Sequence, residues 1–425
     1  MRVWLLQISE PLPMDGPQVR LLRTAVLAER LLARGHEVVW WSGAFDHINK
    51  RHRVRRSVKV PLWDRGEVYL LASCGYRKNV SLWRIVDHFQ VAREFAKLAP
   101  RAPAPDIIVA SLPSQDFCAA GAEYAAKRGI PLIVDLRDQW PDVFLELFPK
   151  WLRKGGRFLL RPFFAQTLRA CRQAAGLVGV TPELLCWGLT YAGRVQSQRD
   201  RVFILGYQPR KYSESVLEEG KDFWDRHGVR AGSEDLTICF FGTMSQQFIL
   251  EPVVETARIL ETEGISVRWI LCGGGDALER LRYRAKALRS VFLPGWVDGI
   301  QIQSLMKRAD VGLAPYPQTP NFYGAFPNKI GEYLSGGLPI LSTLIGGVDE
   351  LLERYQCGWN YEPTNVGGLA SLVKQIIHQR DELSRMSMRA KKLFADYFDA
   401  EKIYPAYVEY IEEAAKIGRV HRQAA

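Results

Sequence analysis

The sequence predicts an α/β protein built from two Rossmann-like, doubly wound parallel-sheet domains that face a cleft. Short apolar runs bounded by turn residues alternate with helical patterns, and this alternation starts again after residue 230. The length of 425 residues also exceeds the ~100–200 residues of one ordinary domain. The apolar runs are nearly continuous, which is typical of strands in parallel sheets that are covered on both faces.

Five runs in the first half have the pattern of buried strands, and they span residues 3–8, 37–41, 106–110, 131–134 and 177–180. A helix is expected over 20–34, because Leu22, Val26, Leu27 and Leu31 recur on one side of it.

Four further strands are expected in the second half, over 236–241, 267–272, 311–314 and 339–342, with helices over 250–261, 367–379 and 397–416. A polar stretch separates the two sets of strands. The predicted organisation is therefore an N-terminal domain over 1–205, a linker over 206–234, a C-terminal domain over 235–395 and a C-terminal helix within 396–425. The sequence leaves open that this helix crosses back to the first domain.

The composition excludes several classes of protein. Apolar residues make up 47% and charged residues 24% of the chain, which is typical of a globular protein rather than a disordered, collagen-like or coiled-coil chain. The seven cysteines lack C-x-x-C spacing, so neither a zinc ribbon nor a disulfide scaffold is expected. The N-terminus lacks signal-peptide features and no apolar run reaches ~18 residues, so a cytoplasmic protein is expected.

The net charge of +11 is concentrated in one half of the chain. Residues 1–200 contain 30 Lys and Arg against 18 Asp and Glu, whereas 201–425 contain 27 against 28. Two segments are strongly basic, 50–59 and 151–172, and the second also carries Trp, Phe and Leu. They favour peripheral attachment to the anionic inner face of the cell membrane, with ordinary solvated helices as the alternative. No nucleic-acid-binding motif accompanies the charge, so a nucleic-acid partner is not expected.

Several catalytic motifs are absent from the sequence. It has no G-x-x-x-x-G-K-[ST] loop, no H-E-x-x-H and no G-x-S-x-G. No D-x-D pair is available to hold a metal-bound diphosphate, so no metal site is predicted. Three glycine turns do follow expected strands, at Gly16, Gly242 and Gly273. Such turns let backbone N–H groups approach a phosphate, although tight turning alone is the alternative explanation.

Residues 321–340 form the most informative segment. Phe326, Pro327 and Asn328 have the pattern of a helix start, and Lys329 and Glu332 are three residues apart on one helix face. A helix N-terminus together with a lysine suits a diphosphate, and a carboxylate one turn further suits two ribose hydroxyls. An ordinary surface Lys–Glu pair is the alternative.

The same segment resembles a signature of the retaining GT-B glycosyltransferases of family 4. Residues 327–339 fit P-x-K-x-x-E-Y-x-x-x-G-x-P, a form that is found in a subgroup that builds bacterial surface polysaccharides. Residues 134–141, VDLRDQWP, resemble the R-D-x-W-P element of that subgroup. Residues 35–38 and 293–297 are similar to the family's G-H-E-V helix end and to its loop facing the nucleotide base.

This resemblance implies transfer of a sugar from a nucleotide-diphosphate donor, preferably a UDP-sugar, to a glycan or polyprenyl-linked acceptor. It implies retention of configuration, no metal and no cofactor, with the N-terminal domain on the acceptor side. Glu332 would hold the ribose, the backbone of 326–329 would contact the diphosphate, and Trp296 would lie near the base. The Gly16 loop would lie opposite the donor.

Two departures from the family pattern stand out. Gly324 occupies the position of the family's first acid, eight residues before Glu332, so recognition of the sugar must differ. The turn after Gly242 lacks the usual Arg and Lys. Lys329 is the expected replacement for this charge, with Arg20 or Arg23 as the second candidate.

Asp138, which follows the strand over 131–134, is the best candidate for a catalytic acid or base, and Lys329 is the other predicted catalytic residue. A structural role for Asp138, held ionised by Arg137, is the alternative. His36 is expected to be structural, and His47, His52 and His88 receive no role.

Two other functions share this architecture. A sugar-nucleotide epimerase would need acidic residues and histidines gathered at the sugar. A non-catalytic sugar-nucleotide-binding protein is compatible with Gly324.

Overall fold

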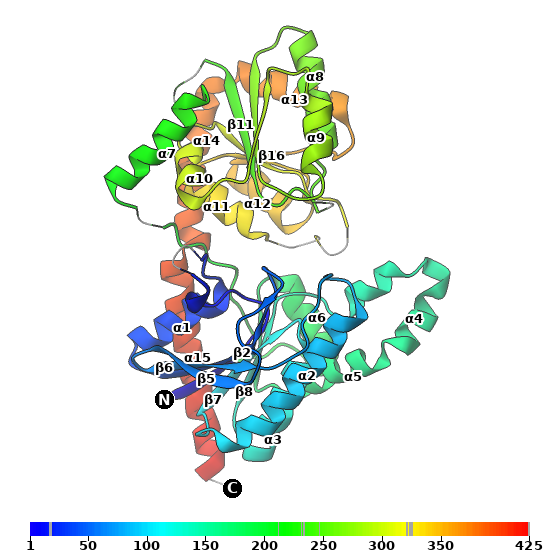
Figure 1. Cartoon of the computed structure of the whole chain (residues 1–425), viewed down its shortest axis with the longest axis vertical. Helices are drawn as coiled ribbons and strands as arrows, with labels where there is room; N and C mark the ends of the chain where they lie inside the picture. Colours follow the sequence, from blue (N-terminus) through cyan, green and yellow to red (C-terminus); the bar gives the residue numbers. More distant parts are fainter. Residues whose placement is uncertain are drawn as a thin grey trace. The chain divides into compact units, whose positions relative to one another are not determined.

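The computed structural model describes residues 1–16, 19–210, 212–230, 232, 234–245, 247–319, 322 and 326–423, without the side chains of 147 and 418–423. It divides into two compact units (Figure 1). Unit 1 comprises Met1–Ile204 and Glu401–Ala425, and unit 2 comprises Leu205–Ala400.

Unit 1 contains an eight-stranded sheet in the order β10-β9-β8-β7-β1-β2-β6-β5. All neighbouring strands are parallel except the edge pair of β5 and β6. The strands are β1 (Arg2–Leu6), β2 (Glu37–Gly43), β5 (Val58–Trp63), β6 (Gly66–Leu71), β7 (Ile107–Leu112), β8 (Leu132–Leu136), β9 (Gly176–Gly179) and β10 (Arg201–Val202), with a small antiparallel ribbon of β3 (Phe45–Asp46) and β4 (Arg51–His52).

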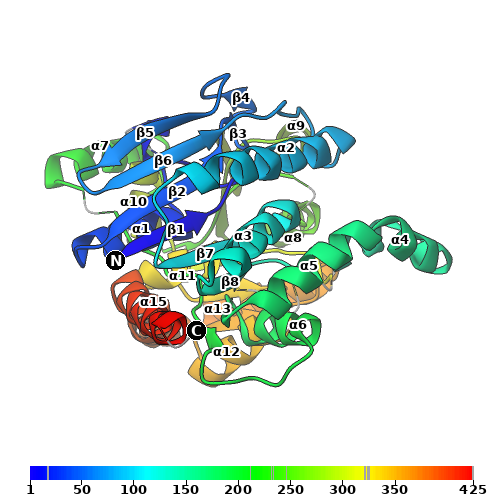
Figure 2. The same cartoon turned by 90° about the horizontal axis from the view of Figure 1, so that it is seen from below.

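Figure 2 shows the helices of unit 1 around its sheet. They are α1 (Arg23–Ala33), α2 (Leu82–Leu98), α3 (Gln115–Arg128), α4 (Arg153–Leu159), α5 (Arg161–Gln173), α6 (Pro182–Ala192) and α15 (Ala400–Gln423). Within the described residues, no helix combines the length and the hydropathy that a membrane crossing requires.

Unit 2 contains a six-stranded sheet in the order β13-β12-β11-β14-β15-β16, in which all neighbours are parallel. Its strands are β11 (Leu236–Phe241), β12 (Val267–Cys272), β13 (Val291–Gly295), β14 (Val311–Ala314), β15 (Ile340–Ser342) and β16 (Gly358–Asn360). Its helices are α7 (Glu214–Arg226), α8 (Glu251–Thr262), α9 (Leu278–Ala285), α10 (Gly299–Met306), α11 (Asn328–Ser335), α12 (Gly347–Tyr355), α13 (Val366–His378) and α14 (Arg380–Leu393).

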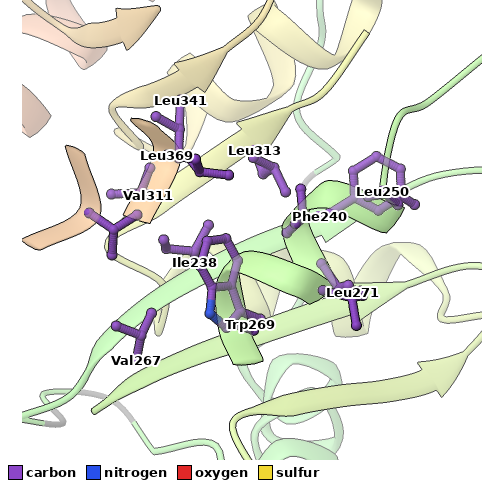
Figure 3. Packing of buried hydrophobic residues seen from close by; sticks show 14 of the residues in the cluster. Ile238, Phe240, Leu250, Val267, Trp269, Leu271, Val311, Leu313, Leu341 and Leu369 are labelled. Atoms are coloured by element: carbon purple, nitrogen blue, oxygen red, sulfur yellow. The ribbon is translucent and has the colours of Figure 1, made fainter. Parts of the chain in front are cut away.

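The core of unit 2 lies between its sheet and the helices on one face. Ile238, Phe240, Trp269 and Leu313 point from alternate positions of three strands into one cluster (Figure 3), and all four are 0% exposed. Burying a large apolar side chain stabilises a fold by ~1.5–3 kcal/mol. The cluster therefore holds β11, β12 and β14 rigidly and fixes the ends of these strands.

Each sheet has one point at which the order of its strands reverses. The chain runs outward from β11 to β13, returns, and then runs outward from β14 to β16, so the reversal in unit 2 lies between β11 and β14. In unit 1 it lies between β1 and β7. Ligands of open α/β sheets bind beyond the carboxyl ends of the strands at such a point. The two doubly wound sheets, one wholly parallel and one with a single antiparallel edge pair, confirm the predicted class of two Rossmann-like α/β domains.

The segment over 206–234, which was expected to be a linker, is part of unit 2. It forms α7, whose Trp224 is 0% exposed and donates a hydrogen bond from its indole nitrogen to the carbonyl of Gln301 at 2.7 Å. The buried residues of this polar helix are Gly220 and Trp224, and Arg308 donates to the carbonyl of Lys221 and to Asp225, so the contacts that hold the segment leave no apolar run in the sequence.

The final helix, α15, packs on unit 1 with a continuous row of buried side chains that includes Tyr404, Tyr407 and Ile411. Polar contacts flank this row. Glu412 lies 2.8 Å from Nε2 of His36, which gives His36 the structural place expected from the sequence.

Candidate functional site

In unit 2, the first turn of α11 lies at the carboxyl edge of the sheet. The helix connects β14 with its parallel neighbour β15, so its N-terminus must lie at the end where β14 stops. Pro327 caps the helix, and Phe326 packs 6.0 Å from the ring of Phe398. A helix N-terminus at a reversal of strand order favours negative charge.

Lys329 points from this turn to the end of β11. Its ammonium group donates a hydrogen bond to the carbonyl of Phe241, and the residue is only 7% exposed. Four aromatic rings surround the nitrogen at 4.5–5.8 Å, from Phe240, Phe241, Phe248 and Tyr333. The positive charge therefore lies beneath the Gly242 turn rather than on an open surface.

The two glycine turns of unit 2 pack directly against each other. A Cβ added to Gly273 would lie 1.8 Å from the carbonyl oxygen of Gly242, and one added to Gly275 would lie 2.5 Å from that of Met244. The N–H of Met244 donates to the carbonyl of Gly274 at 2.8 Å. Close packing between the turns thus requires the glycines, whatever else the turns bind.

Glu332 is 8% exposed, one turn further along α11. The hydroxyl of Tyr207 lies 3.5 Å from its Oε1. Burial and the negative charge of Glu332 raise the pKa of the neighbouring Tyr316 phenol. This carboxylate therefore lies in a largely dry, aromatic surrounding at the same edge of the sheet as Lys329.

The remaining predicted donor residues differ in their setting. Trp296 follows β13 and is 77% exposed, so its ring is available for stacking. Asn328 is exposed in the first turn of α11. Gly16, in unit 1, has a φ of 150° and open space on its Cβ side. Gly324 lies outside the described residues, as does Gln246 in the turn after Gly242.

A buried ionic network occupies the carboxyl edge of the unit 1 sheet. Nε and a terminal nitrogen of Arg23 donate to the two oxygens of Asp135, each at 3.0 Å. Arg137 donates to Asp135 at 2.7 Å and also contacts Glu10. Burial alone would raise the pKa of Asp135, but the charges and hydrogen bonds of Arg23 and Arg137 outweigh it and hold that pKa below its usual value.

This network changes two expectations. Arg20 or Arg23 was the second candidate for a phosphate ligand. Arg23, however, is 4% exposed, and its guanidinium donates two hydrogen bonds to the carboxylate of Asp135. Arg137 was considered as the partner of Asp138, yet its guanidinium enters the network on the side of Asp135. Successive residues of an extended segment point to opposite sides, which separates Arg137 from Asp138.

Asp138 is partly buried just beyond β8. Its Oδ1 accepts a hydrogen bond from the N–H of Gln139 at 2.9 Å. Burial raises its pKa, against the opposing effects of this bond, of the Trp140 side chain and of the charge of Arg84. A carboxyl group with a raised pKa accepts a proton more readily than an ordinary one, which suits general acid–base work.

Side chains that received no role from the sequence contact one another near Trp140, whose side chain, with the charge of Arg84, acts on Asp138. His47 Nδ1 lies 2.5 Å from the hydroxyl of Tyr76, and Arg84 stacks 4.5 Å from the ring of Trp140. The ring of His88 lies 6.5 Å from that of Trp140. Tyr76, Arg84 and His88 follow β6, which was not among the expected strands, and His47 follows β3, so neither spacing nor position marks them in the sequence.

Both histidines are neutral at pH 7. Burial, followed by the charges of Lys50 and Arg84, lowers the pKa of His47 to about 4. Burial, followed by the charges of Arg84 and His47, lowers the pKa of His88 to about 3. Neither ring can therefore supply positive charge to this edge of unit 1 unless an anion is bound.

Comparison with known proteins agrees with this geometry. Residues 235–379 match the model of the family described as glycosyl transferases group 1. A protein of Salmonella typhimurium that is named as a colanic acid biosynthesis glycosyltransferase, WcaL, is 23% identical over 218 residues, which are 50% of this chain and 52% of that protein. The chain spans about half the length of the curated relatives it matches.

Solved structures extend the likeness to nearly the whole chain. HepE of Anabaena in complex with UDP has a TM-score of 0.65 at 17% identity, over 97% of this chain and all of that one. WaaG, a glycosyltransferase involved in lipopolysaccharide biosynthesis, has a TM-score of 0.65 at 16% identity, over 98% of this chain and 99% of that one.

The fold is therefore that of the GT-B glycosyltransferases. Within it, residues 235–379 match the group 1 glycosyl transferases, which agrees with the resemblance to GT-B glycosyltransferases found in the sequence.

Proposed function

We propose that the protein is a retaining glycosyltransferase that moves a sugar from a UDP-sugar to a glycan or lipid-linked glycan, without a metal ion. One observation carries this proposal. The first turn of α11, with Lys329 and Glu332, lies at the end of β11 beside the strand reversal of a group 1 glycosyltransferase domain. The similar structure of HepE contains UDP, and a second crystal structure of HepE contains UDP-glucose, which favours this nucleotide.

The chemistry follows from the charge that develops during transfer. As the bond between the sugar and the diphosphate breaks, negative charge grows on the leaving oxygens and positive charge on the sugar ring. Fixed N–H dipoles and a buried cation stabilise the leaving group without rearranging. The N-terminal turn of α11 supplies the dipoles, and Lys329 supplies positive charge beneath the Gly242 turn. Glu332 accepts hydrogen bonds from the ribose hydroxyls.

On the acceptor side, unit 1 supplies Asp138. Its raised pKa suits a group that takes the proton of the attacking hydroxyl. Asp138 is thus the proposed base of the reaction, and Lys329 the proposed stabiliser of the leaving group.

Peripheral attachment to the inner face of the cell membrane is part of the proposal. Trp151, Phe158 and Leu159 are 80%, 77% and 70% exposed, within the basic segment over 151–172. Figures 1 and 2 show α4, which carries two of them, projecting from unit 1. Exposed aromatic side chains among basic residues are typical of helices that lie in a membrane interface. The segment over 50–59 contributes less, because Arg53 is held by Asp15 at 2.6 Å.

Flotation with phosphatidylglycerol vesicles at physiological salt tests the attachment. We expect the wild-type protein to float and the Trp151→Ser/Phe158→Ser variant to stay in solution. A Trp296→Ser variant, which loses an equally exposed ring from unit 2, serves as control. Wild-type protein that ignores these vesicles would refute the attachment.

Transfer itself is tested by thermal-shift screening against a panel of sugar nucleotides, followed by product analysis with the stabilising donor in the presence of EDTA. We expect a UDP-sugar to raise Tm and a glycosylated acceptor with retained anomeric configuration to form. Release of an epimerised sugar nucleotide would identify an epimerase. Binding without any product would identify a non-catalytic sugar-nucleotide-binding protein.

A further inference from the structure

The loop over 7–16 follows β1 and lies at the strand reversal of unit 1. β1 pairs with β7 across this reversal. Because ligands of open α/β sheets bind beyond the carboxyl ends of the strands at such a point, the loop borders the place where unit 1 is expected to bind its ligands. The loop ends in a 3-10 turn over Pro13–Asp15 that leads into Gly16. We call residues 12–16 the Gly16 turn.

The backbone of Gly16 has a conformation that other residues avoid. Its φ is 150°, and a Cβ added to it would meet no atom within 4 Å in the described part of the chain. Packing therefore does not require a glycine at this position, whereas the backbone conformation does. A turn with this conformation and with so few close neighbours depends on other contacts to keep its shape.

An ion pair supplies such a contact from outside the loop. Nε and one terminal nitrogen of Arg53 donate to the two carboxylate oxygens of Asp15, each at 2.6 Å. The side chains of Arg53 and Asp15 are only 6% and 5% exposed. Two parallel hydrogen bonds between charged groups fix the direction of both side chains as well as their distance. The pair therefore holds the turn more firmly than a solvated ion pair would.

Both partners of this pair are also bonded to the backbone. Asp15 accepts a hydrogen bond from the N–H of Leu12 at 2.8 Å, which closes the turn on itself. The other terminal nitrogen of Arg53 donates to the carbonyls of Gly43 and Phe45, at 3.1 and 3.2 Å. Gly43 ends β2, which is the sheet neighbour of β1. The pair thus connects the turn to the end of a buried strand.

The first part of the loop is held by a second set of buried contacts. Glu10 is 7% exposed and accepts hydrogen bonds from the N–H and the hydroxyl of Thr24, each at 2.9 Å. Arg137 donates to Glu10 and, at 3.0 Å, to the hydroxyl of Thr24. The loop over 7–16 is therefore fixed near both of its ends by other elements of unit 1.

We propose that Asp15 and Arg53 are positioning residues that keep the Gly16 turn in the shape that sugar transfer requires. This inference rests on the proposed function. The two residues act through the backbone of the turn rather than by contact with a substrate. Buried ion pairs are weak sources of stability, since well-packed apolar side chains often serve as well. What this pair supplies is a defined geometry for a loop that borders the substrates.

Two variants of the full-length protein separate positioning from stability. Arg53→Met leaves the carboxylate of Asp15 buried without its partner, so Tm should fall. Asp15→Ala/Arg53→Met removes both charges, so Tm should recover relative to the single variant. In both variants kcat for transfer should stay ~10–100-fold below that of wild type, because the turn is no longer fixed and small misplacements are costly.

UDP titration and hydrogen exchange complete the test. UDP affinity should weaken much less than kcat, because the proposed nucleotide site with Lys329 and Glu332 lies in unit 2. The amides of residues 7–16 should exchange faster in both variants than in wild type. Arg93→Met, which removes an exposed arginine of α2, should match wild type in kcat, Tm, UDP affinity and exchange.

Three results would overturn the proposal. Recovery of kcat together with Tm in Asp15→Ala/Arg53→Met would show that the pair serves stability alone. Unchanged exchange over 7–16 in Arg53→Met would show that the pair does not fix the turn. Equal losses of kcat and UDP affinity would assign the effect to nucleotide binding. Absence of transfer by the wild-type protein would instead refute the proposed function, and hydrogen exchange would still show whether the pair fixes the turn.

Discussion

Lys329 combines a buried charge with proximity to the proposed leaving group. A charged amine within a protein is costly unless hydrogen bonds and favourable dipoles compensate it. Here the carbonyl of Phe241 and the faces of four aromatic rings do so. Such an amine keeps its position without a ligand, and fixed charges of this kind stabilise a transition state without reorganising.

Replacing Lys329 by Met keeps the length and apolar stem of the side chain and removes the charge. We expect kcat for transfer from the UDP-sugar to fall ~100–1000-fold, as when one stabilising donor is removed from an active site. Binding of UDP should weaken much less. Steady-state kinetics and calorimetric titration measure the two effects. A Lys374→Met variant on α13 should behave as wild type, and an unchanged kcat in Lys329→Met would remove Lys329 from the chemistry.

The ionised carboxylate of Asp138 is predicted to lower the stability of the fold while it supports activity. Burial raises its pKa in the folded state, so its ionised form is less stable there than in the unfolded chain. The charge therefore lowers stability at any pH above the folded-state pKa, and the penalty disappears as the pH falls below the unfolded value of ~3.9. Asp138→Asn should raise Tm at pH 7 and leave it unchanged near pH 3.

The same variant should lose activity, because an amide cannot accept the acceptor's proton. We expect kcat to fall ~100- to 10,000-fold, the usual contribution of a general base. Asp135→Asn is the matched comparison, because the pKa of Asp135 is held low and its ionised form stabilises the fold. That variant should lower Tm at pH 7. Full activity in Asp138→Asn would assign this carboxylate a structural role.

At the scale of elements, the two glycine turns of unit 2 act as one unit. Gly273→Ala would place a methyl group 1.8 Å from the carbonyl of Gly242, so at least one of the turns must move. We expect lower Tm and weaker UDP binding. Gly274→Ala is a matched control, because its methyl group would meet no atom within 4 Å. Equal behaviour of the two variants in thermal-shift and titration experiments would contradict this account.

Helix α15 is an integral part of the core of unit 1. Tyr407 is 0% exposed, stacks 4.6 Å from Phe203 and lies 5.0 Å from the guanidinium of Arg23. Its hydroxyl has no hydrogen-bond partner among the described residues. Tyr407→Phe should therefore leave stability unchanged or raise it, since an unsatisfied hydroxyl is removed.

Tyr407→Ala should cost ~3–5 kcal/mol, the usual cost of deleting a large buried ring. Chemical denaturation followed by circular dichroism measures both variants. A strongly destabilised Tyr407→Phe would show that the hydroxyl is bonded, and a harmless Tyr407→Ala would show that α15 is dispensable.

The elements that the sequence predicted are those with a strong apolar signal. β11, β12 and β14 begin and end where their apolar runs do, because each strand is buried on both faces. β5 and α7 were not predicted. β5 lies at the edge of its sheet with half of its residues exposed, and the buried residues of α7 are Gly220 and Trp224, so neither carries an apolar run.

Across the whole molecule, the candidate site shows a similar difference between residues that are close in the sequence and residues that are distant in it. Lys329 and Glu332 could be proposed from the sequence because they lie within one helical turn of each other. The contacts among His47, Tyr76, Arg84 and Trp140 were not predicted, because these residues are spread from residue 47 to residue 140 and meet only in the folded unit.

Calorimetric titration of UDP into the full-length protein tests the central claim most directly. The account predicts that wild-type protein binds UDP, and that Glu332→Gln weakens binding ~10–100-fold by removing charged hydrogen bonds to the ribose. Glu353→Gln, an exposed carboxylate on α12, should bind UDP as wild type does. If wild type binds no nucleoside diphosphate, or Glu332→Gln binds UDP with unchanged affinity, the nucleotide does not lie at the first turns of α11.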